Sequence, residues 1–84
     1  MILKWSEQGW EDYLYWQKTD KKIIKRINKL IEDIKRDPFD GLGNPEPLKY
    51  NWSGFWSRRI DQEHRLVYAV ENNEILIAQC RYHY

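Results

Sequence analysis

The feature of the sequence that most limits its possible folds is an amphipathic repeat between about residue 20 and residue 37. Its apolar side chains recur at every third or fourth position and so fall on one helical face: Ile23, Ile27, Leu30, Ile31 and Ile34, with Ile24 beside them. Thr19 or Asp20 can cap the start of this helix, and Pro38 disfavours its continuation past Asp37. The repeat predicts a long helix whose apolar face must pack on a second layer of the fold.

The residues before this repeat predict a strand and a shorter helix. Residues 2–5 alternate between apolar and polar side chains, which is typical of a short strand. Ser6 can cap a helix from about residue 7 to residue 17, in which the residues at helical spacing are Trp10, Tyr13, Leu14 and Gln17. Because only two or three residues separate this helix from the next, we expect an antiparallel helical hairpin.

The last third of the chain is typical of β-structure. Residues 55–60, 65–70 and 74 to about 81 are rich in Trp, Tyr, Val and Ile, and the polar segments 61–64 and 71–73 separate them as turns. These runs predict a three-stranded antiparallel meander. The predicted order is β-α-α-β-β-β, an α+β fold in which the N-terminal helical hairpin packs on one face of an antiparallel sheet.

Composition narrows the class of protein. The chain has 84 residues and a formal net charge of +1, which excludes the strongly basic character of a general nucleic-acid binder. No run approaches the about 20 apolar residues of a membrane span, so we expect one cytoplasmic domain over residues 1–84 with no membrane association. A single cysteine excludes an internal disulfide framework, and Cys80 is expected to be a packed free thiol. The tryptophans Trp10, Trp16 and Trp56 are assigned to the core or to a dimer interface.

Basic residues divide between the two halves of the chain. Those from residue 43 onward are Lys49, Arg58, Arg59, Arg65 and Arg81, and arginine suits bidentate contact with phosphate. By strand alternation, the sets that contain Arg59, Arg65, and Arg81 together with His83 could converge on one open, electropositive face of the sheet. Alternation alone leaves open which sets are coplanar. We therefore predict Arg59 and Arg81 as candidate phosphate ligands.

The helical half carries most of the lysines. Lys18, Lys22, Lys25 and Lys29 follow one another at about one helical turn and predict a basic stripe. One interpretation is a solvated helix face laced with Asp and Glu. The other is a track for RNA phosphates.

Two residues are candidates for acid–base chemistry. Glu46 lies between Pro45 and Pro47 in the irregular loop 38–47, so a stiff backbone presents its carboxylate. His83 lies in a C-terminal run dense in functional side chains. Their alternative interpretations are a solvated loop carboxylate and a frayed tail. His64 falls in a predicted turn, where we expect it to face solvent.

Metal and cofactor chemistry find little support in the sequence. No His or Cys pair has the spacing of a metal site, and no glycine-rich phosphate loop precedes a helix, so we expect neither a metal nor a cofactor. A glutamate, a histidine and several arginines suffice for RNA cleavage without a metal. The base removes the ribose 2′-OH proton, the acid protonates the departing 5′-oxygen, and arginine stabilises the charged phosphoryl centre.

Five segments together resemble a known family. They are the Trp10-Glu11-Asp12-Tyr13 run with Tyr15 and Trp16, the loop 43–48 around Pro45-Glu46-Pro47, the run 53–60 with Ser53-Gly54-Phe55-Trp56, the segment 63–68, and the ending Cys80-Arg81-Tyr82-His83-Tyr84. The chain resembles, over its whole length, the YoeB/Txe toxins of bacterial type II toxin–antitoxin modules, within the RelE/ParE superfamily. The resemblance implies a RelE-like fold and a ribosome-dependent mRNA endonuclease that cuts the codon in the ribosomal A site and inhibits translation.

The resemblance also implies roles for particular residues. Glu46 is similar to the general base of the family, His83 to the general acid and Arg65 to the stabiliser of the transition state. Lys49, Arg59 and Tyr84 match positions that support the phosphate or the base, and Tyr84 is suited to stack on a nucleotide. The implied products are a 2′,3′-cyclic phosphate, or a 3′-phosphate, and a 5′-hydroxyl.

Partners follow from the same resemblance. It implies the 70S ribosome with its mRNA, a homodimer, and an antitoxin of the YefM/Axe type whose DNA-binding domain carries the complex to operator DNA. Two other functions stay open, because a fold does not determine a function. One is a toxin of the same superfamily that inhibits DNA gyrase by binding it, and the other is a non-enzymatic module that binds RNA or a protein partner.

Overall fold

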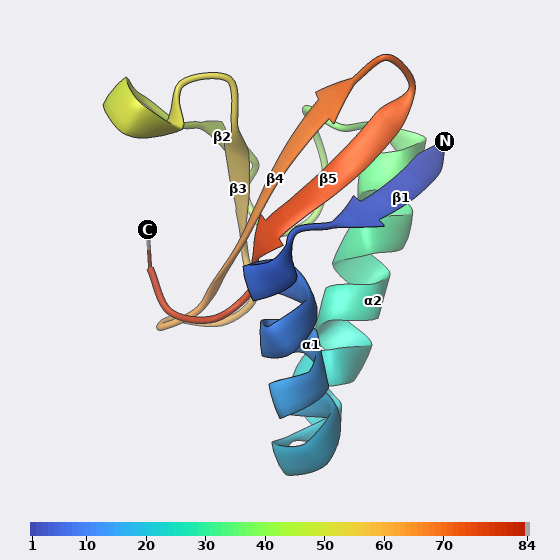
Figure 1. Cartoon of the computed structure of the whole chain (residues 1–84), viewed down its shortest axis with the longest axis vertical. Coiled ribbons are helices and arrows are strands. Elements are labelled where there is room, and N and C mark those ends of the chain that lie inside the picture. Colours follow the sequence, from blue (N-terminus) through green and yellow to red (C-terminus); the bar gives the residue numbers. More distant parts are fainter. Residues whose placement is uncertain (84) are drawn as a thin grey trace.

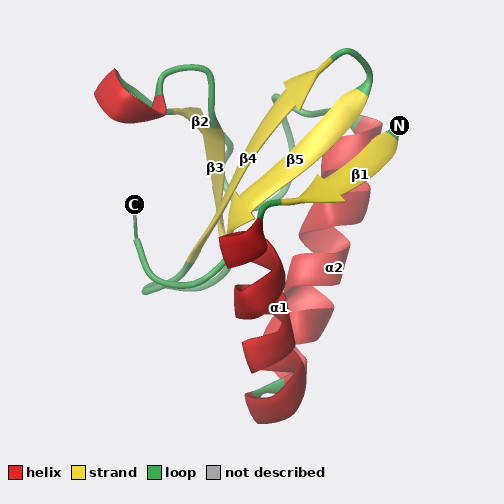
Figure 2. Ribbon diagram, viewed as in Figure 1, coloured by secondary structure: helices red, strands yellow, loops and turns green. Residues whose placement is uncertain are grey.

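The computed structural model describes residues 1–83, and Tyr84 lies outside the described residues. In chain order its elements are β1 (Ile2–Trp5), α1 (Glu7–Thr19), α2 (Lys21–Arg36), β2 (Glu46–Pro47), the 3-10 helix η1 (Tyr50–Trp52), β3 (Trp56–Arg59), β4 (Arg65–Glu71) and β5 (Glu74–Gln79). The helical hairpin lies on one side of a twisted sheet (Figure 1), and Figure 2 shows the same arrangement by type of element. The predicted α+β order is confirmed, with β2 and η1 added to it.

Short polar side chains set the ends of both helices. Ser6 caps α1, because its hydroxyl accepts a hydrogen bond from the N–H of Gly9 at 2.9 Å. Asp20 serves both helices, since its N–H donates to the Trp16 carbonyl and its carboxylate accepts from the N–H groups of Lys22 and Ile23. Asp20, rather than Thr19, is therefore the cap of α2. Helix α1 extends two residues beyond its predicted end and meets α2 at this one shared residue.

The sheet has five strands in the order β1-β5-β4-β3-β2. The predicted meander is confirmed, because β3, β4 and β5 pair antiparallel along the chain. Strand β1 instead pairs parallel with β5, so the sheet is not purely antiparallel. At the other edge the two residues of β2 pair with β3, where Pro47 costs little because an edge strand has an unpaired side. The sequence predicted only irregular loop at that position.

The core fills the space between α2 and one face of the sheet. The predicted apolar stripe of α2 is confirmed, since Ile27, Leu30, Ile31 and Ile34 are buried and Ile23 and Ile24 are half-buried against them. The sheet contributes Trp56, Ile60, Leu66, Tyr68, Val70, Ile75 and Ile77. We call the sheet face opposite the helices the open face.

The residues that helix α1 buries most deeply are not those that fall at helical spacing in the sequence, although Tyr13 of that set is half-buried against the core. Its buried residues are Gly9, Asp12 and Trp16. Because one of these is a glycine and another is charged, the buried face does not appear as an apolar repeat in the sequence. Trp10, predicted to pack in the core or in a dimer, is 47% exposed and stacks on Tyr13 with a centroid distance of 6.0 Å. A core position for Trp10 is therefore wrong, whereas Trp16 is buried and Trp56 is half-buried against the core.

Gly9 brings α1 unusually close to β5. A methyl group at this position would lie 2.5 Å from the carbonyl oxygen of Ile77. We therefore expect Gly9→Ala to lower the free energy of unfolding by about 1–3 kcal/mol through overpacking, although alanine is the better helix former. Urea unfolding checks this, with the exposed Glu11→Ala as control. A more stable Gly9→Ala protein would contradict the close packing.

Among residues 1–83, neither helix is both long and apolar enough to cross a membrane.

Candidate functional site

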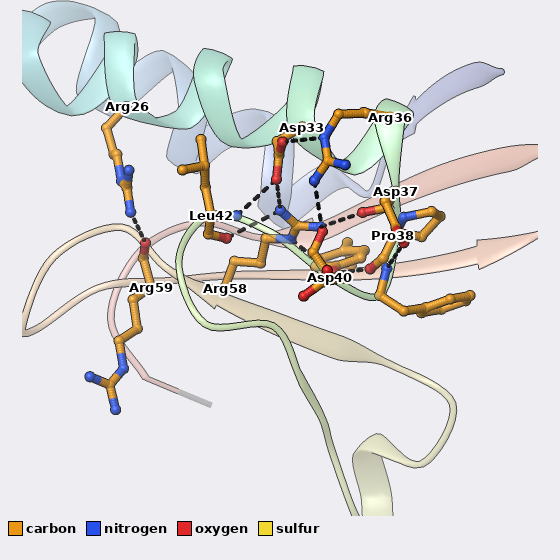
Figure 3. Close-up of polar contacts among 11 residues, drawn as sticks. Arg26, Asp33, Arg36, Asp37, Pro38, Asp40, Leu42, Arg58 and Arg59 are labelled. Carbon is orange, nitrogen blue, oxygen red and sulfur yellow. Dashed lines mark hydrogen bonds and ion pairs between the residues drawn. The ribbon is translucent and has the colours of Figure 1, made fainter.

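A buried arginine shapes the loop that leads to Glu46. The side chain of Arg58 is fully buried and donates to the Asp33 carboxylate at 2.6 Å (Figure 3). Its remaining bonds go to the carbonyls of Asp37, Asp40 and Leu42 and to the hydroxyl of Tyr68, so all five guanidinium N–H groups have acceptors. The loop thus wraps around Arg58. Of the sheet arginines that the sequence offered for phosphate contact, Arg58 is unavailable.

The Asp33 carboxylate makes this network sensitive to acid. Hydrogen bonds from Arg36, Leu42 and Arg58 hold the pKa of the Asp33 carboxyl well below its ordinary value of 3.8. A group whose pKa is lower in the folded state stabilises the fold above its unfolded pKa and loses that contribution as the pH falls. We expect the free energy of unfolding of the wild type to decrease below about pH 4. The difference in this free energy between wild type and Asp33→Asn should therefore become smaller at that pH. Urea unfolding at a series of pH values checks this, and a difference that stays constant would contradict it.

The loop then delivers Glu46 to the edge of the sheet. The Gly43 carbonyl accepts the Arg59 N–H at 2.7 Å, and Glu46 pairs with Ser57 of β3. The Glu46 carboxylate is exposed and accepts a hydrogen bond from the Asn44 amide at 2.9 Å. Strand pairing on one side and the two prolines on the other therefore hold the backbone of Glu46 in an extended conformation.

Register places Glu46 and two arginines on the open face. Residues directly opposite one another on paired strands share a face. Ser57 pairs with both Glu46 and Val67, and Arg59 pairs directly with Arg65 two positions further along. Their neighbours Arg58 and Leu66 point into the core, so all of these side chains point the other way. The predicted convergence of Arg59 and Arg65 is confirmed.

The two arginines are held differently. Arg65 is half-buried, and its Nη1 donates to the carbonyls of Asp61 at 2.7 Å and His64 at 3.0 Å, so its guanidinium is tied to the β3–β4 turn. Arg59 is exposed, with its carbonyl accepting from Arg26 at 3.2 Å and its side chain pointing away from that contact (Figure 3). An arginine with a fixed guanidinium and an exposed arginine therefore occupy paired positions on neighbouring strands.

The chain after β5 folds back toward the open face. Cys80 is anchored on α1, because its N–H donates to the Asp12 carboxylate at 3.0 Å and its carbonyl accepts from Trp16 at 2.8 Å. Burial raises the pKa of the Cys80 thiol, as expected for a packed cysteine. Further on, the Gln79 amide donates to the carbonyl of the exposed His83 at 3.2 Å. Residues 80–83, which we call the C-terminal segment, curl away from the helices (Figure 1).

A bulge in β5 corrects the predicted face of this strand. Val67 pairs with Gln79 but Tyr68 pairs with Ile77, so Ala78 is an extra residue. Ile77 consequently faces the core while Gln79 joins Val67 on the open face. The strand also ends at Gln79, before the predicted end near residue 81. Arg81 therefore does not join Arg59 and Arg65 on the open face, as strand alternation suggested. Its guanidinium lies over the Tyr15 ring of α1, 3.6 Å from the ring centroid.

His64 is the residue whose place the sequence prediction most misjudged. It was expected to face solvent, but it is only 8% exposed. Its ring packs edge-on against Trp16, with a centroid distance of 4.7 Å, and its Nδ1 accepts the Tyr82 N–H at 2.7 Å. Asp12 and Trp16, which hold Cys80, were also missed as site residues. Their spacing of four residues is the one local signal that places them on the same helix face.

The remaining predicted residues are Lys49, the four lysines of the helices and Tyr84. Lys49 is exposed beside η1, at a surface hollow of about 420 Å³ that also includes Tyr50 and Trp52. Lys18 ends α1, whereas Lys22, Lys25 and Lys29 lie on α2, so the predicted stripe spans two helices; all four are exposed. Tyr84 lies outside the described residues. Within residues 1–83, no group of three or more His, Cys, Asp and Glu side chains is arranged to hold a metal ion.

The structure thus combines a helical hairpin on one face of the sheet with a carboxylate and paired arginines on the other. Residues 5–84 match the family described as YoeB-like toxin of bacterial type II toxin-antitoxin system. Toxin YoeB of Escherichia coli strain K12 is 68% identical over 84 residues, which cover 100% of both chains. The chain belongs to the YoeB toxin family.

Solved structures agree with this assignment. The YoeB/ParE toxin from Agrobacterium tumefaciens superposes with a TM-score of 0.98 at 50% identity, covering 100% of both chains. A chain of the YoeB-YefM complex from Staphylococcus aureus gives a TM-score of 0.93 at 49% identity, and the YoeB dimer from that organism gives 0.93 at 50%. Both cover 100% of this chain and 98% of the other. The predicted family and fold are thereby confirmed.

Proposed function

We propose that this toxin is a ribosome-dependent endoribonuclease that cleaves mRNA in the ribosomal A site by acid–base catalysis without a metal, and so inhibits translation. The observation that carries the proposal is the row of side chains across the open face. Glu46 lies at one end, and Ser57, Val67 and Gln79 lead to the His83 carbonyl at the other. With strands about 4.8 Å apart, the backbones of Glu46 and Gln79 are about 14 Å apart. Ser57 and Val67 between them are buried, so a phosphodiester would lie over them, next to the exposed Glu46.

The proposed reaction uses one carboxylate, one imidazole and one guanidinium. Glu46 takes the proton of a ribose 2′-OH, and the 2′-oxygen attacks the adjacent phosphorus. The bond to the 5′-oxygen breaks, and His83 gives that oxygen a proton. Arg65, tied to the β3–β4 turn, stabilises the additional negative charge on the phosphoryl oxygens. The products are a 2′,3′-cyclic phosphate, which can open to a 3′-phosphate, and a 5′-hydroxyl.

Other residues take supporting roles in the proposal. Arg59 and Lys49 are exposed cations close in sequence or register to Glu46 and would bind phosphates on either side of the cleaved bond. Tyr84 would stack on a nucleotide. Arg81 is held against Tyr15 and Tyr82, so we assign it an indirect role beside the RNA.

In this proposal the ribosome provides the binding to RNA for which the chain itself has little net charge. A net charge of +1 provides little non-specific attraction for RNA. The exposed Lys18, Lys22, Lys25 and Lys29 would instead contact ribosomal RNA, and the ribosome would hold the codon against the open face. We also propose a homodimer and a YefM/Axe-type antitoxin, as in the Staphylococcus aureus structures, with operator DNA bound only through the antitoxin complex. The exposed Trp10 is suited to dimer packing.

The test is a purified translation system with ribosomes stalled on a defined codon. Wild-type protein is expected to produce new 5′ ends within the A-site codon. Glu46→Gln should lower the cleavage rate by about 100-fold or more while it still co-sediments with ribosomes. The matched control Glu11→Gln changes an exposed glutamate of α1 and should cleave normally.

Two outcomes would contradict the proposal. Equal cleavage by Glu46→Gln and wild type would remove the carboxylate from the chemistry. Intact mRNA, together with DNA breaks in growth-arrested cells, would favour the gyrase inhibitor instead. Ribosome binding without any cleavage would favour the non-enzymatic binding module.

A further inference from the structure

His64 is held rigidly in the turn between β3 and β4. The carboxylate of Asp61 accepts the N–H groups of Glu63 at 2.9 Å and His64 at 2.7 Å, which fixes the backbone of the turn. The imidazole packs between Trp16 of α1, with centroids 4.7 Å apart, and Tyr82 of the C-terminal segment, with centroids 5.4 Å apart. A buried polar ring in such a position needs a specific hydrogen-bond partner.

That partner is the backbone of Tyr82. The Tyr82 N–H donates to His64 Nδ1 at 2.7 Å, and the Tyr82 carbonyl accepts from the Arg65 N–H at 3.1 Å. His64 at the end of the turn and Arg65 at the start of β4 therefore bind both backbone polar groups of Tyr82. We call this pair of bonds the Tyr82 clamp.

The clamp maintains an unfavourable backbone conformation. Tyr82 has a φ of +63°, in the left-handed region that a bulky side chain seldom adopts. Such a residue persists only where its surroundings impose it, and it turns the chain sharply. The turn directs the next residue, His83, toward β5, where its carbonyl meets the Gln79 amide at 3.2 Å. The position of His83 thus depends on the clamp.

We propose that His64 is a positioning residue, which through its unprotonated Nδ1 holds Tyr82 in the left-handed turn and so places His83 at the open face. This inference rests on the proposed function in its role for His83. It requires a neutral His64 with its proton on Nε2, since an imidazolium has no lone pair to accept the Tyr82 N–H. Acid therefore opens the clamp.

Charged groups of both signs lie around His64. The Glu63 carboxylate lies 3.7 Å from Nε2 and suits a proton on that nitrogen. The Asp61 carboxylate is engaged by the turn, and the Arg65 guanidinium is engaged by the His64 carbonyl. The Arg81 guanidinium lies over the far ring, Tyr82, at 4.7 Å. Trp16 is the uncharged contact from α1. The two histidines thus need opposite states, His64 neutral and His83 protonated.

The test compares two substitutions in the full-length toxin. His64→Asn offers an amide oxygen close to the position of Nδ1 and does not titrate, whereas His64→Ala offers no acceptor. Relative to wild type, His64→Ala should speed hydrogen exchange of the Tyr82 amide by about 10-fold or more. It should also lower kcat for ribosomal mRNA cleavage by about 10-fold, with KM changed less than about threefold. His64→Asn should keep both within about threefold of wild type near neutral pH.

The pH profile separates positioning from simple packing. Wild-type cleavage should fall on acidification, because a protonated His64 cannot accept the Tyr82 N–H, and His64→Asn should lose less. Equal loss of activity in both variants, with an acid decline in His64→Asn like that of wild type, would reduce His64 to a packing residue and overturn the proposal.

A measurement without ribosomes keeps the two proposals distinguishable. In the isolated wild-type toxin, nuclear magnetic resonance should show the Tyr82 amide losing protection on acidification, while amides of α2 remain protected. Retained protection would overturn the clamp, even if His64→Ala does not fold. If the amide behaves as expected but the wild type does not cleave mRNA, the proposed function fails and the clamp stands.

Discussion

Replacing His83 with alanine is expected to lower the rate of A-site mRNA cleavage by about 100-fold or more, the usual contribution of a positioned general acid. The folded state should change little, because His83 is exposed and lies outside the helices and strands. Single-turnover cleavage on stalled ribosomes measures the first effect and thermal unfolding measures the second.

Substrate chemistry provides the control for this prediction. An mRNA whose scissile linkage carries a better leaving group than the ribose 5′-oxygen needs less help from an acid, so it should recover much of the lost rate in His83→Ala. It should not rescue Glu46→Gln, which lacks the base. Normal cleavage by His83→Ala, or equal rescue of both variants, would contradict the assignment of His83 as the acid.

Arg58→Met is expected to cause the largest loss of stability among single substitutions at the site. Arg58 is fully buried, and its removal would take one of three donors from the Asp33 carboxylate and the Arg58 hydrogen bonds from the Asp37, Asp40 and Leu42 carbonyls. Breaking a buried pair on one side typically costs about 3–5 kcal/mol, which corresponds to a fall in Tm of about 15 °C or more for a chain of this size.

Arg36→Met is the matched control. Arg36 binds the same Asp33 carboxylate, at 2.9 Å, but its side chain is 60% exposed. A solvated pair contributes about 1 kcal/mol or less, so Arg36→Met should unfold near the wild-type temperature. Similar losses in the two variants would show that the Arg58 network does not hold the loop. Because this loop leads to Glu46, Arg58→Met should also cleave mRNA poorly below its unfolding temperature.

The regular elements were predictable because their signals are local. The α2 stripe repeats at the helical period over several turns, and Asp20 lies at the position where a cap is needed. Strands β3 to β5 are β-rich runs between polar turns, so their antiparallel pairing also followed from short-range pattern. Strand β2 was missed because two residues carry no period, and its pairing with β3 depends on the loop around Arg58.

The sequence predicted which residues are candidates for the site better than it predicted how those residues are arranged. The resemblance to YoeB toxins selected Glu46, Arg65 and His83 as candidates, and the structure brings Glu46 and Arg65 to one face. It did not reveal the role of His64, because a histidine in a turn has no local pattern that distinguishes exposure from burial. That ring is covered by Trp16 of α1 and by the return of the C-terminal segment, both distant from it in the sequence.

Arg58 and Arg59 show most directly which features the sequence determines and which depend on the tertiary structure. Sequence by itself determined that the two side chains point to opposite faces, because alternation is a property of any strand. It also determined the long helix and the capping of its start. The tertiary structure decided which arginine is buried among loop carbonyls and which is exposed beside Arg65, because that depends on the face that the helices cover. It likewise decided, through the Ala78 bulge and the Tyr82 clamp, where His83 lies, because both arise from contacts between residues distant in the chain.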